Sequence, residues 1–140
     1  MKAAVLLRVA SALTLLHAVL HTVGGVFGKT PPGPASVAVA AMRANEFVFM
    51  GATRTYWDFQ RGLGLAVTIF LTMEALVFWR LAPIAKRDGR ALRPVLAIFA
   101  LGYVAFAADS MAYFFTMAAV MELVIAVLLV WAAVATKSES

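Results

Sequence analysis

Five ionisable residues lie inside apolar stretches of this sequence, where a charged side chain needs a specific reason. They are His17, His21, Glu74, Asp109 and Glu122. His17 and His21 are the only two histidines, and their spacing of four residues places both imidazoles on one face of a helix. A neutral imidazole and a carboxylate that is shielded from water can exchange a proton near neutral pH. We therefore predict acid–base chemistry, with His17 or His21 as the base and Glu122 or Asp109 as the acid.

The same histidine spacing is also used to bind metal ions. His17, His21 and Glu122 together would make a site of two histidines and one carboxylate. An H-E-x-x-H motif is absent, because Ala18 follows His17, and membrane hydroxylases use many more histidines than two. Two axial haem ligands cannot both come from positions i and i+4 of one helix. The sequence therefore favours no cofactor and keeps a metal ion or a haem as the weaker alternative.

The segments that hold these residues have the composition of a membrane protein. Of the 140 residues, 64% are hydrophobic and 14% are charged, which is unusual for a soluble domain. Residues 94–136 would be about 65 Å long as one helix, roughly twice a bilayer core, so a turn is expected near residues 112–117. We predict one domain, residues 1–140, with four membrane spans at about 9–27, 63–81, 94–111 and 116–136.

The predicted fold is all-α, an integral membrane four-helix bundle with a short amphipathic helix in the outer loop between helices 1 and 2. This loop covers residues 28–60, and the helix is expected within residues 35–50. A second loop, "APIAKRDGRALRP" at residues 82–94, is basic and contains Gly and Pro.

The basic residues predict the orientation of the bundle. One side holds eight of them: Lys2, Arg8, Arg80, Lys86, Arg87, Arg90, Arg93 and Lys137. The other side holds four: Lys29, Arg43, Arg54 and Arg61. The positive-inside rule therefore places both termini in the cytoplasm of a bacterial inner membrane. The same clustering explains the net charge of +5 as a topology signal, so no nucleic acid partner is expected.

Depth along the helices predicts which polar groups meet. Counting about 1.5 Å per residue places His17, His21, Asp109 and Glu122 in the outer half of the membrane and Glu74 beyond its midplane. Polar side chains at one depth of a bundle are expected to point inward and meet. The segment "RTYWDFQRG" lies above this layer, and Glu74 lies below it. We predict that these flanking residues gate the site or orient its ligand: Arg54, Tyr56, Trp57, Asp58, Arg61 and Glu74.

Two classes of function fit this pattern. The leading one is a membrane-embedded enzyme that acts on a small lipophilic substrate in an outer-leaflet pocket. The reaction would be an isomerisation, an epoxide opening or a cyclisation. The alternative is a non-enzymatic binding, transport or accessory subunit, in which the polar residues form a structural network. The sequence leaves open whether the protein is an enzyme. In both cases the expected partners are the lipid bilayer, a small lipophilic ligand and further copies of the chain.

Two segments carry a resemblance to a family. "EFVFMGATRTYWDFQRGLGLAVTIF" (46–70) and "LTLLHAVLHTVGGVFG" (13–28) are similar to small, uncharacterised four-helix membrane proteins of bacteria that contain a YWDF motif. The chain also loosely resembles DoxX-like four-helix proteins. The resemblance implies the architecture and a bacterial membrane, and it implies no activity.

Overall fold

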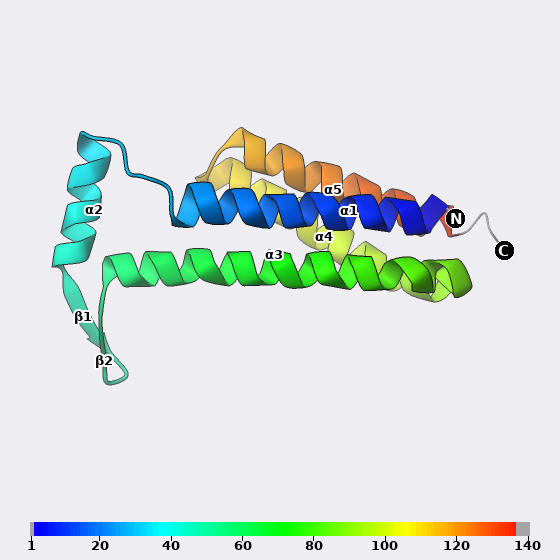
Figure 1. Cartoon of the computed structure of the whole chain (residues 1–140), viewed down its shortest axis with the longest axis horizontal. Helices are drawn as coiled ribbons and strands as arrows, with labels where there is room; N and C mark the ends of the chain where they lie inside the picture. Colours follow the sequence, from blue (N-terminus) through cyan, green and yellow to red (C-terminus); the bar gives the residue numbers. More distant parts are fainter. Residues whose placement is uncertain (1, 137–140) are drawn as a thin grey trace. The chain divides into compact units, whose positions relative to one another are not determined.

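The computed structural model describes residues 2–136, so Lys137 of the charge count lies outside the described residues. Figure 1 shows the order of the elements along the chain. Helix α1 (Lys2–Leu20) continues as a π-helix, η1 (His21–Val26). The remaining elements are α2 (Pro34–Ala44), β1 (Glu46–Phe49), β2 (Ala52–Thr55), α3 (Tyr56–Arg87), α4 (Gly89–Tyr113) and α5 (Thr116–Ala135). Apart from one hairpin, the regular structure of this part of the chain is helical.

Four helical segments are long and apolar enough to cross a membrane. They are Lys2–Val26, Tyr56–Arg87, Gly89–Tyr113 and Thr116–Ala135. The prediction of an all-α fold with four such helices is therefore confirmed, as is a helix, α2, between the first and the second. The predicted turn between the last two helices is also confirmed, because α4 ends at Tyr113 and α5 begins at Thr116.

The residues divide into two compact units. The first unit contains residues 2–17 and 71–136, and its helices share one core in which small residues allow close approach. Buried positions recur every three or four residues, the spacing of bundle interfaces. We call these positions the seam. On α4 it comprises Leu96, Ala100, Tyr103, Ala107 and Ser110, and on α1 it includes Leu7, Ala10, Thr14 and His17.

The prediction of a loop at residues 82–94 is wrong, because nearly all of this basic segment is helical. Helix α3 continues through Pro83 to Arg87, and only Asp88 separates it from α4. The Asp88 side chain accepts a hydrogen bond from the Ala91 backbone N–H at 3.4 Å, which caps α4. The buried positions continue through both helix ends, at Ala82 and Ala85 and then at Leu92. Packing of these residues keeps the segment helical although its composition is that of a loop.

The second unit contains residues 18–70 and includes a β-hairpin that was not predicted. The predicted amphipathic helix ends at Ala44, and the next residues pair Glu46–Phe49 with Ala52–Thr55. Met50 and Gly51 form the turn with φ angles of 50° and 82°. Two consecutive positive φ values are typical of a tight hairpin turn, in which glycine is favoured at the second position. The hairpin leads directly into Tyr56, the first residue of α3.

Candidate functional site

His17 and Glu122, predicted partners from the first and last helices, lie next to each other in the first unit. The distance from His17 Nε2 to Glu122 Oε1 is 3.9 Å. The Ser110 hydroxyl donates a hydrogen bond of 3.0 Å to the same carboxylate oxygen. His17 is 8% exposed and Glu122 is 0% exposed. Within residues 2–136, the buried Oε2 of Glu122 accepts no hydrogen bond. We call this group the His17–Glu122 pair.

The His17–Glu122 pair lies in a packed seam and not in a cavity. The His17 ring stacks on Phe106, with ring centroids 6.1 Å apart and an interplanar angle of 22°. Ala107, next to Phe106 on α4, and Ala119, three residues before Glu122 on α5, are also buried. Because side chains surround the pair, it is well placed to fix helix register and poorly placed to contact a substrate.

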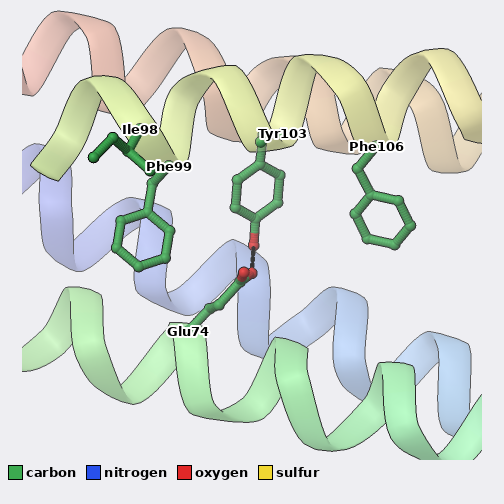
Figure 2. Close-up of a pocket in the computed structure, with 6 residues that line it drawn as sticks. Glu74, Ile98, Phe99, Tyr103 and Phe106 are labelled. Atoms are coloured by element: carbon green, nitrogen blue, oxygen red, sulfur yellow. Dashed lines mark hydrogen bonds between the residues drawn. The ribbon is translucent and has the colours of Figure 1, made fainter.

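A second polar cluster joins α1, α3 and α4. The Tyr103 hydroxyl donates a hydrogen bond of 2.7 Å to Oε2 of Glu74 (Figure 2). The same hydroxyl lies 3.2 Å from Thr14 Oγ1, and either atom can be the donor. Thr14 and Tyr103 are buried, whereas Glu74 is half-buried. Thr14 precedes His17 by three residues, a rise of about 4.5 Å along α1, so the two polar clusters lie about one helical turn apart.

Glu74 borders a groove between α3 and α4, with a volume of about 380 Å³. We call it the Glu74 groove; its lining residues are Glu74, Ile98, Phe99, Gly102, Tyr103 and Phe106. Figure 2 shows Phe99, Tyr103 and Phe106 pointing from α4 toward α3, from which the Glu74 side chain points to the Tyr103 hydroxyl. The groove thus combines three aromatic rings with one carboxylate. His17 and Glu122 do not line it.

Asp109 does not join Glu122, although their estimated depths are similar. Its side chain is exposed, and the neighbouring Ser110 occupies the seam and bonds Glu122 instead. One residue along an α-helix is a rotation of about 100°, and on α4 this rotation turns Asp109 out of the seam that Ser110 faces. The predicted role of Asp109 as the acid therefore has no support from its position.

His21 lies in the second unit, where it connects two helical segments. Its Nε2 lies 3.0 Å from the Gly64 carbonyl oxygen, a distance that requires the nitrogen to donate its hydrogen. A nitrogen that carries a hydrogen cannot coordinate a metal ion. Within residues 2–136, no group of three or more His, Asp or Glu side chains is arranged to hold a metal. The alternative of a metal site formed by His17, His21 and Glu122 therefore gains no support from the donor geometry.

The residues predicted to gate the site anchor the beginning of α3. The Asp58 carboxylate accepts hydrogen bonds from the Thr55 backbone N–H at 3.0 Å and from the Thr55 hydroxyl at 2.8 Å. Thr55 Oγ1 in turn accepts the Asp58 backbone N–H at 3.1 Å, which completes a reciprocal helix cap. Asp58 and Arg61 form no ion pair with each other, because Asp58 bonds Thr55 and the Arg61 guanidinium lies 4.7 Å from the centre of the Phe27 ring.

The aromatic and basic residues around this cap also have local partners. Arg43 stacks over Trp57 at 4.8 Å, and Tyr56 packs against Phe47 with ring centroids 5.0 Å apart. Arg54 donates to the carbonyl oxygen of Thr53 at 2.7 Å. These contacts explain the segment as a rigid start of α3, and a gating role remains a prediction.

The sequence interpretation missed Thr14, Tyr103 and Ser110 as members of the two polar clusters. Their spacing along the helices could have identified them. Tyr103 and Ser110 are seven residues apart, and Thr14 precedes His17 by three residues. Polar residues at such positions face the same interface.

Comparison of the chain with protein-family models, with curated proteins and with solved structures found no match. The functional argument therefore depends on the geometry of the residues described above.

Proposed function

We propose that this chain is an integral membrane protein that binds a small, mostly apolar molecule in the Glu74 groove. The observation that supports this most directly is a groove of about 380 Å³ in which one carboxylate and one phenol lie among apolar side chains. Small-molecule sites have this character, because apolar walls supply affinity while a few polar groups fix orientation. The polar end of the ligand would meet Glu74 and Tyr103, and its apolar part would contact Phe99 and Phe106.

The surface of the first unit supports membrane insertion. Many large apolar side chains are exposed there, among them Val5, Leu76, Trp79, Leu101, Val127 and Trp131. An apolar exterior of this extent suits lipid and not water. We place the protein in a bacterial inner membrane with both termini in the cytoplasm, as the basic residues favour, and we propose that it forms homo-oligomers.

The orientation has a direct test, because the sequence contains no cysteine. Single cysteines at Ser36, in α2, and at Asp88, between α3 and α4, can be tested for labelling by a membrane-impermeant maleimide on intact and on opened cells. We expect labelling of S36C from the outside and labelling of D88C only after the cells are opened. The reverse pattern would overturn the proposed orientation.

Acid–base catalysis on the bound molecule is a second candidate function. The observation in its favour is that the Glu74 carboxylate borders the groove, where it could take a proton from, or return one to, a bound substrate. Isomerisation, epoxide opening and cyclisation remain the reaction types that such a group would serve. In this proposal Glu74 contacts the substrate, Tyr103 positions Glu74, and the His17–Glu122 pair holds the helices in register.

Filling the groove tests the main proposal. Nothing lies within 4 Å of a Cβ atom added at Gly102, so Gly102→Leu would place a side chain into the groove without a backbone clash. Gly62→Leu is a matched control, because Gly62 is also helical and open but lies outside the groove. Mass spectrometry of the purified proteins should find a small molecule that co-purifies with wild type and G62L and is lost from G102L. Equal amounts in all three would count against the groove.

A further inference from the structure

Glu74 is an acid that has no cationic partner among residues 2–136. Within residues 2–136, no Lys, Arg or His nitrogen lies within 4 Å of its carboxylate. Tyr103 donates to Oε2, and among residues 2–136 no hydrogen bond to Oε1 is found. A carboxylate that is ionised in an apolar groove loses much of its hydration, so it interacts strongly with any positive charge that enters. An ionised Glu74 would therefore favour a cation as the ligand of the groove.

The walls of the groove select the kind of cation. Phe99, Tyr103 and Phe106 stand four and three residues apart on one face of α4, beside the carboxylate. Aromatic faces attract alkylated ammonium groups, and clusters of such rings are a recurrent means of recognising them. A small inorganic ion would find one carboxylate and no further charged ligand in this lining. A cation with apolar substituents would satisfy both the charge and the rings.

The position of Glu74 separates a freely diffusing cation from a lipid headgroup. Glu74 lies seven residues before Leu81, the nearer end of the predicted span at residues 63–81, which is a distance of about 10 Å along the helix. The choline or ethanolamine group of a phospholipid resides at the membrane surface, whereas a lipophilic amine can reach this depth. The Glu122 carboxylate differs, because it is sealed in the seam beside His17 and Ser110.

We propose that the Glu74 groove binds a lipophilic organic ammonium cation, with Glu74 as its counter-ion and the rings of Phe99, Tyr103 and Phe106 as its apolar contacts. This inference depends on the proposed function, since it names the ligand class of the same groove. Tyr103 contributes by holding one carboxylate oxygen, which directs the other toward the ligand.

The test compares two probes of the same shape. Phenyltrimethylammonium and tert-butylbenzene differ in the replacement of a quaternary nitrogen by carbon, so their binding isolates the charge. Titration calorimetry of the full chain in a non-ionic detergent should show binding of the cation at least about tenfold tighter than that of the neutral probe. Glu74→Gln should remove this preference, while Glu122→Gln, which removes a carboxylate outside the groove, should keep it.

A variant of the aromatic wall makes the test independent of the carboxylate. Phe99→Leu keeps an apolar side chain and removes one ring, so it should weaken cation binding by about three- to tenfold and change the neutral probe less. This variant also decides the question if E74Q does not fold. Repeating the titration in nanodiscs with phosphatidylcholine separates the two sources of ammonium: competition by this lipid would show that a headgroup, and not a free cation, occupies the groove.

The outcomes test the ammonium ligand separately from the proposed function, which is the binding of a small molecule in the Glu74 groove. Equal binding of both probes, or a cation preference that survives E74Q, would overturn the inference and leave a groove for neutral ligands. Absence of binding by either probe would also overturn the inference. The comparison of G102L with G62L would then decide separately whether the groove binds any molecule.

Discussion

The Tyr103 hydroxyl lies 2.7 Å from Glu74 Oε2 and 3.2 Å from Thr14 Oγ1, so one phenol joins three helices of the first unit. A hydrogen bond to a carboxylate away from water is stronger than one between neutral groups. The arrangement fixes the Glu74 side chain at the edge of the groove. It also links the seam, where Thr14 is buried, to the open side of α4.

Replacement of Tyr103 by phenylalanine should weaken this connection. Y103F deletes the hydroxyl and leaves the ring, so we expect a loss of about 1–2 kcal/mol in the free energy of unfolding. Unfolding of the protein in mixed micelles measures this loss. Tyr113→Phe is the control, because Tyr113 is 78% exposed and should change the stability little. Equal stability of Y103F and Y113F would show that the bond contributes nothing.

Replacement of Ser110 by alanine should destabilise the seam. The Ser110 hydroxyl donates the only hydrogen bond found to the Glu122 carboxylate within residues 2–136. S110A leaves a buried carboxylate with fewer partners, and we expect a loss of about 1–3 kcal/mol. The exposed neighbour provides the comparison, since Asp109→Ala should change the stability by less than about 0.5 kcal/mol. A larger loss in D109A than in S110A would contradict the assignment of the seam.

Two neighbouring glycines of α3 should respond differently to alanine. A Cβ added at Gly64 would lie 3.0 Å from Val26 Cγ2 and 3.9 Å from His21 Nε2, whereas one added at Gly62 meets nothing within 4 Å. We expect G64A to lose about 1–2 kcal/mol, because the contact with η1 must shift. G62A should gain up to about 1 kcal/mol from helix propensity. Thermal unfolding of the two variants checks the prediction, and a stabilised G64A would argue against the His21 contact.

The helix cap at the start of α3 should be measurable through Thr55. Thr55 exchanges hydrogen bonds with Asp58 in both directions, so T55A should lower the stability by about 1 kcal/mol, the usual loss at an N-cap. Thr53→Ala changes an exposed threonine two residues away and serves as the control. The same thermal assay applies. If T55A and T53A melt together, the segment is not held by this cap.

Much of the fold follows from apolar length and turn signals, and less of the site does. The run from Pro94 to Thr136 is too long for one span, which predicted the turn that the structure has at Phe114 and Phe115. Counting residues along each helix predicted that His17 and Glu122 lie at the same level, and the structure places them side by side. Such a count gives the position of a residue along the helix axis but not the direction in which its side chain points. For this reason Asp109 was predicted to lie beside Glu122, where the structure has Ser110.

The Glu74 groove could not be predicted from the sequence, because it depends on which faces of α3 and α4 lie opposite each other. Glu74 was expected to lie below the layer of polar groups, and its hydrogen-bond partner is a tyrosine 29 residues away. The hairpin was missed for a different reason. "EFVFM" continues an apolar helical pattern, and only the positive φ angles at Met50 and Gly51 reveal the turn.

An experimental structure of the purified full chain tests the central claim most directly. The account predicts ligand density in the groove between α3 and α4, in contact with Glu74 Oε1 and the rings of Phe99 and Phe106. It predicts no ligand density between His17 and Glu122. An empty or collapsed groove, or a ligand bound against Glu122 Oε2, would contradict it.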